Sequence, residues 1–82
     1  MYEDLASAKS RVIGTKQTVR ALERGCAMAV YVAMDAEERV IRGIKALCSS
    51  KGIPVIAVSS MDELGKVCGI DVGAASAAIL RE

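Results

Sequence analysis

Histidine is absent from this 82-residue sequence, and so are phenylalanine and tryptophan. Without histidine the chain lacks the commonest general base and the Ser–His and Cys–His pairs that activate nucleophiles. No pair of acids stands out to replace them, so we expect a non-enzymatic protein that uses no cofactor. The only aromatic residues are Tyr2 and Tyr31, too few for a platform on which unpaired bases stack. If the protein binds RNA, it should recognise a structured shape.

Metal-binding cysteine patterns are also missing. Cys26, Cys48 and Cys68 form no C-x-x-C pair, whereas a zinc site needs about four ligands at recognisable spacing. We therefore expect no metal site. An odd number of scattered thiols fits a reducing compartment, with the cysteines as small buried side chains.

Long hydrophobic runs are lacking as well. No apolar stretch approaches the roughly 20 residues that span a bilayer, and the acidic start Met1-Tyr2-Glu3-Asp4 is unlike a signal peptide. We expect a cytoplasmic protein with no membrane partner. The 52% hydrophobic content of 82 residues predicts one folded domain, 1–82, with a single core, and we expect it to be a monomer.

Short apolar runs alternate with helical patterns along the whole chain. Capping-box spacings place helix starts at Asp35 with Glu38 and at Ser60 with Glu63. This order predicts an α/β fold with helices on both faces of a four-stranded sheet. The expected helices are 2–9, 14–25, 35–52 and 60–68, and the expected strands are 11–13, 29–34, 55–58 and 76–80.

Positive charge is concentrated in one segment, from Lys9 to Gly25. This segment holds five basic residues and one acid, so it carries +4, whereas the whole chain carries only +1. Such a concentration is typical of a protein with an anionic partner. The five basic residues are Lys9, Arg11, Lys16, Arg20 and Arg24.

The start of the helix in this segment has suitable chemistry for binding. Gly14 allows close approach of the backbone, and the free N–H groups of a helix start attract phosphate. Lys16 can donate to guanine, and Gln17 can both donate and accept at base edges. The spacing alone fits an ordinary amphipathic helix with a solvated basic face equally well.

The loop Gly69–Gly73 places Ile70 and Val72 where apolar side chains are not needed for solubility. They could anchor the loop on the core, or they could form a small apolar surface on which an unstacked base rests. The residues alone favour anchoring, because loops commonly fix themselves with a buried side chain.

Four stretches together resemble a known family. Gly14-Thr15-Lys16-Gln17-Thr18, followed by Arg20 and Arg24-Gly25, is similar to the RNA-binding motif of the large-subunit ribosomal proteins seven-Ae and thirty-e. The strand leading into Asp35, the stretch 52–55 and the stretch 64–72 leading to 77–79 agree with that family. The resemblance covers essentially the whole chain and is closest to a small bacterial ribosomal-protein-like paralogue. Lys16-Gln17 follows the thirty-e and paralogue pattern, where many seven-Ae members carry Asn-Glu.

The resemblance implies a three-layer α/β/α sandwich. The crossovers favour parallel pairs of strands, but four strands this short also fit a mixed sheet, which we expect. The resemblance also implies an RNA-binding protein that recognises kink-turns, sharply bent duplexes with tandem sheared G·A pairs, in ribosomal or regulatory RNA and not in DNA. By position, Lys16 and Gln17 would read the G·A pairs, with Gly14 and Thr15 close to the backbone. The remaining motif residues, Thr18, Arg20 and Arg24, would support them or meet phosphates, and Ile70, Asp71 and Val72 would pack against a looped-out nucleotide.

With this resemblance, RNA binding outweighs the solvated-face interpretation of the helix, and base contact moves ahead of anchoring for the loop. A protein-interaction module of a ribonucleoprotein remains the alternative, with the apolar loop and the helix 36–51 as its contacts. A small-molecule or enzyme domain is least favoured, because the sequence offers no convergent set of polar groups.

Overall fold

A computed structural model describes residues 2–81 of the chain. Four helices alternate with four strands in this range, as the sequence predicts. The alternation of short apolar strands with amphipathic helices is the pattern of a layered α/β domain. In chain order the elements are α1 (Glu3–Ser7), β1 (Arg11–Ile13), α2 (Thr15–Glu23), β2 (Ala27–Ala33), α3 (Glu38–Lys51), β3 (Val55–Val58), α4 (Met61–Val67) and β4 (Ser76–Leu80).

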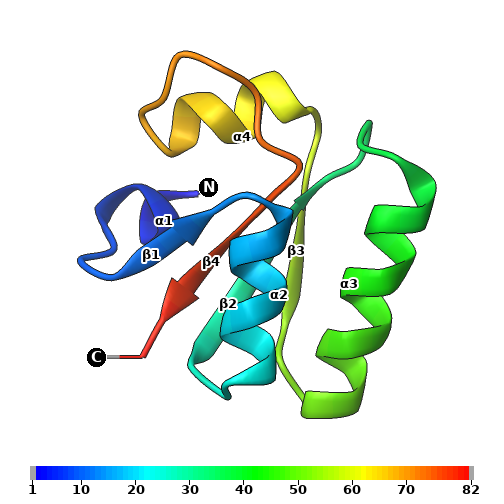
Figure 1. Cartoon of the computed structure of the whole chain (residues 1–82). Coiled ribbons are helices and arrows are strands. Elements are labelled where there is room, and N and C mark those ends of the chain that lie inside the picture. Colours follow the sequence, from blue (N-terminus) through cyan, green and yellow to red (C-terminus); the bar gives the residue numbers. More distant parts are fainter. Residues whose placement is uncertain (1, 82) are drawn as a thin grey trace.

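The strands form one four-stranded sheet in the order β1-β4-β2-β3. β4 runs antiparallel to both of its neighbours, whereas β2 and β3 are parallel. Figure 1 shows α2 and α3 on one face of the sheet and α1 and α4 on the other. The prediction of a three-layer α/β/α sandwich with a mixed sheet is confirmed.

Apolar side chains fill both spaces between the layers. Along β2 successive side chains point to opposite faces, so Val30 packs in the cluster with Leu22 and Ile44 from α2 and α3. Its neighbour Tyr31 packs in the other cluster, with Leu64 of α4. Each such buried side chain contributes about 1.5–3 kcal/mol. The inner face of α2 is thereby fixed on the sheet, and its outer face is left to solvent.

One of the two predicted helix caps is confirmed and the other is wrong. The Ser60 hydroxyl accepts the N–H of Glu63 at 3.0 Å and caps α4. By contrast, α3 begins at Glu38 without any side-chain cap. Asp35 lies three residues before that start, and its Oδ1 accepts the N–H of Met61 at 2.8 Å. A carboxylate expected at α3 therefore caps α4.

The bounds of α1 and β2 also differ from the prediction. α1 is shorter than 2–9, and β2 begins at Ala27 because that residue pairs with Leu80. The pairing with β4 shifts between Ala27 and Ala29, which is the pattern of a β-bulge. The side chain of Met28, in the bulge, is 53% exposed.

The cysteines are all free thiols, but they differ in burial. Cys48 and Cys68 are buried as expected, and burial raises the pKa of each thiol. The expectation is wrong for Cys26, which is exposed in the turn between α2 and β2. None of the helices within residues 2–81 is long and apolar enough to cross a membrane, and those residues contain no metal-binding cluster of His, Cys, Asp or Glu.

Candidate nucleic-acid interface

Gly14 joins β1 to α2 in a conformation that few other residues adopt. Its φ and ψ are +108° and 154°, a region of backbone space used almost only by glycine. Its N–H donates to the Ser76 carbonyl of β4 at 2.8 Å, and its carbonyl accepts the N–H of Thr18 at 3.0 Å. A Cβ here would lie 2.7 Å from Oε1 of Gln17. The Gln17 amide therefore folds back over a glycine that leaves it room.

The first turn of α2 presents unpaired backbone donors. An α-helix cannot satisfy its first N–H groups internally, and no side chain caps α2. Within the described residues, the N–H groups of Thr15, Lys16 and Gln17 have no hydrogen-bond partner. The helix dipole adds partial positive charge at the same point, so this turn is suited to an anion or to base acceptors.

Three basic side chains follow along the exposed side of α2. Lys16, Arg20 and Arg24 are spaced four apart, so they lie near one another on the helix, and all three are exposed. No carboxylate of residues 2–81 forms an ion pair with them. We call these three residues the basic strip. Its charges are free to interact with a partner.

A shallow groove runs beside the basic strip. Gln17, Arg20 and Arg24 line it together with Cys26 and apolar residues of β1 and β4, and its volume is about 270 Å³. Arg20 and Arg24 thus belong both to the basic strip and to the lining of this groove. The groove therefore places apolar surface beside the charges of the basic strip.

Thr15 and Thr18 belong to the same turn but are placed differently. Thr15 Oγ1 accepts the hydroxyl of Ser76 at 3.3 Å. Thr18 is 0% exposed, and its Oγ1 has no partner in the described residues. Of the two roles predicted for Thr18, support of Lys16 and Gln17 or contact with phosphate, its burial favours support. It supports the motif from inside.

Arg11 does not belong to the basic strip, although the sequence groups it with the same charges. Its guanidinium donates to the carbonyls of Leu5 at 3.1 Å, Ala6 at 3.4 Å and Cys68 at 2.8 Å. These carbonyls lie towards the C-terminal ends of α1 and α4, and that of Leu5 also accepts the N–H of Ala8 at 3.3 Å. Arg11 thus joins two helix ends instead of facing a partner.

The loop 69–73 lies tightly against α4. A Cβ on Gly65 would collide with the carbonyl oxygen of Val72, so only glycine at that position lets the loop approach. Ile70 is half-buried against the core and its N–H donates to the Gly65 carbonyl at 3.0 Å. Val72 is 71% exposed, and Asp71 is exposed as well. Ile70 anchors the loop, and Val72 and Asp71 are available for contact.

The loop and the start of α2 are held at the same edge of the sheet, by which we mean one end of its strands and not an outermost strand. β1, β2 and β3 end there, and β4 begins there. The start of α2 is attached to β4 by the hydrogen bond between Gly14 and Ser76. The segment that follows the loop is attached to the end of β2, because the Ala75 carbonyl accepts the N–H of Ala33 at 2.9 Å. Figure 1 shows α4 with its loop and the start of α2 towards this end of the molecule.

Two further exposed apolar side chains lie at this edge and were missed from the sequence. Met34 follows β2 and is 46% exposed, and Met61 begins α4 and is 36% exposed. No signal in the sequence marks either residue, because Met34 falls in the expected strand 29–34 and Met61 in the expected helix 60–68, where apolar side chains are ordinary. With Val72 they add an apolar component to an otherwise polar edge.

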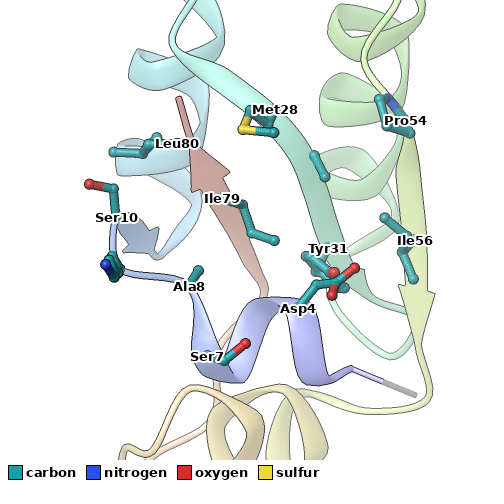
Figure 2. A pocket seen from close by; sticks show the side chains of 12 residues that line it. Asp4, Ser7, Ala8, Ser10, Met28, Tyr31, Pro54, Ile56, Ile79 and Leu80 are labelled. Atoms are coloured by element: carbon teal, nitrogen blue, oxygen red, sulfur yellow. The ribbon is translucent and has the colours of Figure 1, made fainter. Parts of the chain in front are cut away.

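A separate cleft of about 550 Å³ lies on the opposite face of the sheet, beside α1 (Figure 2). Ile56 and Ile79 form part of its floor, and Asp4 lies near Tyr31 at one end. Burial, with a smaller contribution from Asp4, raises the pKa of Tyr31, so its phenol stays protonated near neutral pH. Apolar and polar residues line this cleft together, and Lys9 is the one basic residue among the described residues of the lining.

The fold and this edge define a class of protein. The chain belongs to the Ribosomal protein L7Ae/L30e/S12e/Gadd45 family, whose sequence model matches residues 2–82. The resemblance seen in the motif around Gly14 is thereby confirmed.

Proteins similar to this chain are found in bacteria and in a eukaryote. An RNA-binding protein of Halalkalibacterium halodurans is 53% identical over 78 residues, which cover 95% of each chain. The RNA-binding protein YbxF of Geobacillus stearothermophilus is 50% identical over 80 residues, 98% of each chain. Among solved structures, the Giardia lamblia 15.5kD RNA binding protein superposes with a TM-score of 0.86 at 26% identity, over 99% of this chain and 68% of that one. These relatives are named for binding, in agreement with a non-enzymatic protein.

Proposed function

We propose that this protein binds structured RNA and recognises kink-turns. The observation that carries the proposal is the first turn of α2, where unpaired N–H groups follow Gly14 and the residues Lys16 and Gln17 are exposed. Membership of a family whose bacterial relatives are named RNA-binding proteins supports it. A kink-turn presents its G·A pairs in a widened groove that can accept a helix start.

Within this proposal, base reading and phosphate binding are divided between residues. Lys16 and Gln17 read the sheared G·A pairs, while Gly14 and Thr15 lie close to the RNA backbone. Arg20 and Arg24 meet phosphates along the helix, and these contacts position the RNA but carry little sequence information. Thr18 acts only indirectly, from its buried position.

The loop 69–73 supplies a second contact. Val72 has the exposed apolar side chain that a looped-out nucleotide can pack against, and Asp71 lies beside it. Ile70 contributes mainly by anchoring, since it is half-buried. Binding then selects the bent RNA conformer from a flexible ensemble, because only that conformer meets both contacts at once.

We also propose that the protein acts as a monomer in the cytoplasm, on ribosomal or regulatory RNA and not on DNA. The reducing compartment suggested by the free thiols and the family's ribosomal name support this setting.

The deciding experiment is a titration of the protein against a labelled kink-turn RNA and a matched straight duplex at two salt concentrations. Tighter binding to the kink-turn, with bending at saturation, is the expected result. Equal and strongly salt-dependent binding to both RNAs would reduce the motif to a non-specific basic patch. Binding to neither RNA would favour a protein-interaction module.

Replacing Gln17 by alanine tests the base reading. Gln17→Ala is expected to weaken binding to the kink-turn by about 1–3 kcal/mol, because a base edge loses its partner. Lys45→Ala, an exposed position on α3, is the control and should leave the affinity unchanged. Equal affinities of wild type and Gln17→Ala would remove Gln17 from the interface.

A further inference from the structure

Asp35 makes a contact that neither the family motif nor the basic strip accounts for. It is exposed just beyond the end of β2, and its Oδ1 accepts the N–H of Met61, the first residue of α4, at 2.8 Å. Such an N–H has no partner within its own helix. The carboxylate therefore attaches the start of α4 to the segment that follows β2.

The same residue of α4 also holds the far end of the loop 69–73. The Met61 carbonyl accepts the N–H of Ala74 at 3.1 Å. A Cβ on Gly73 would lie 3.1 Å from Cβ of Met61, so the loop passes close to this residue. A short series of contacts thus runs from Asp35 through Met61 to the residues that end the loop.

The near end of the loop depends on α4 as well, through Ile70 and the Gly65 carbonyl. α4 and the loop therefore form one packed unit, which Asp35 attaches to the β2 end of the sheet. The start of α2 is attached to the same edge through Gly14 and Ser76. The distance between the two predicted RNA contacts follows from these attachments.

We propose that Asp35 is a positioning residue for RNA recognition, which holds α4 and its loop in register with the start of α2. This inference rests on the proposed function of the two contacts. Asp35 itself need not touch RNA. Its carboxylate acts through Met61, and its loss lets the loop sample positions from which Val72 misses the nucleotide.

Electrostatics alone predicts the opposite effect, which makes the inference testable. Asp35 is a negative charge at an edge that faces a polyanion, so neutralising it should strengthen RNA binding if charge is all that matters. Asp35→Asn and Asp35→Ala remove the same charge. They differ because asparagine keeps an oxygen that can accept the Met61 N–H, whereas alanine does not.

The binding experiment compares these two variants with Ser60→Ala on the kink-turn RNA. Asp35→Ala is expected to bind the RNA about tenfold more weakly. This factor corresponds to the loss of the one hydrogen bond that orders the start of α4. Asp35→Asn should bind at least as tightly as wild type. Ser60→Ala also removes a cap of α4 but leaves the attachment to β2 intact, so it should lower stability without lowering affinity.

Amide hydrogen exchange on the free protein provides a readout that needs no RNA. The Ala74 N–H, which donates to Met61, should exchange faster in Asp35→Ala than in Asp35→Asn or Ser60→Ala. Equal exchange in all three variants would overturn the positioning role, as would equal losses of affinity in Asp35→Ala and Ser60→Ala or tighter binding by Asp35→Ala. If wild type shows no preference for the kink-turn, the proposed function fails, and the exchange of Ala74 alone decides whether Asp35 orders the loop.

Discussion

At the scale of single residues, the candidate interface depends on missing side chains and unpaired N–H groups as much as on the side chains that are present. Gly14 and Gly65 lack side chains where a Cβ would meet Gln17 or the Val72 carbonyl. The exposed donors at the start of α2 lack partners within the described residues. These unoccupied positions and unpaired groups are what a ligand can use.

Gly14→Ala is expected to lower both stability and RNA affinity. Alanine at φ +108° costs about 1–3 kcal/mol of backbone strain, and its Cβ displaces the Gln17 amide. Urea unfolding and RNA titration measure the two effects. Gly25→Ala is the control, since φ is also positive there but nothing lies within 4 Å of a new Cβ. It should lose stability and keep its affinity, and a matching loss of affinity would contradict the role of Gly14.

At the scale of elements, the short helices α1 and α4 are held by side chains that come from elsewhere in the chain. Arg11 of β1 joins the ends of both, and Asp35 caps the start of α4. Helices of this length are not stable in isolation. The position of the loop 69–73 therefore reflects these long-range contacts more than the propensity of α4 itself.

Replacing Gly65 by alanine and replacing Gly43 by alanine should change the free energy of unfolding in opposite directions. Gly65→Ala places a Cβ against the Val72 carbonyl, and overpacking of this kind lowers the free energy of unfolding by about 1–3 kcal/mol. Gly43 lies in α3 with open space around it, so Gly43→Ala should raise that free energy by about 0.5–1 kcal/mol. Denaturant titrations of the two variants measure the difference. A stabilised Gly65→Ala would show that the loop does not need the close approach.

Arg11→Met should lower the free energy of unfolding, but it should not remove a contact with RNA. Three carbonyls lose a charged donor, and hydrogen bonds to charged groups contribute about 1.5–3 kcal/mol. Lys9→Met, a neighbouring exposed position, should leave the free energy of unfolding nearly unchanged. If Arg11→Met kept full stability but weakened RNA binding, Arg11 would belong to the interface after all.

At the scale of the whole molecule, the net charge of +1 conceals a strongly uneven distribution. The basic strip lies on one side of α2, whereas the arginines of α3 lie beside glutamates, as in Arg39 with Glu37 and Arg42 with Glu38. Such exposed pairs contribute little to stability. They do, however, reduce the positive potential that α3 presents to an anionic partner.

This distribution predicts which arginines set the salt dependence of RNA binding. Arg20→Ala and Arg24→Ala should each lower the slope of log affinity against log salt by about 1, because each removes a phosphate contact. Arg42→Ala is the control and should leave the slope unchanged. Equal changes from all three variants would indicate a diffuse attraction in place of a defined interface.

Contacts between residues close in sequence could be predicted for this protein, whereas contacts between distant residues could not. The Ser60 cap acts within one turn and was predicted correctly, as were the alternating elements and the layered fold. Asp35 was misassigned because the N–H it accepts is far away in sequence. The role of Arg11 could not be predicted, because its carbonyl partners are brought to it only by packing. The burial of Thr18 follows from the rotation of α2 on the sheet, which charge spacing does not specify.

The place of β4 in the sheet has a consequence for how the protein is made. β4 lies between β1 and β2, yet it is synthesised after every other strand. β1 and the start of α2 therefore have no completed sheet to rest on until β4 inserts, and Gly14 lacks the Ser76 carbonyl that holds it. Contacts between such distant parts of the chain slow the folding. A nascent chain emerging from a ribosome can thus complete the candidate interface only after β4 has been synthesised.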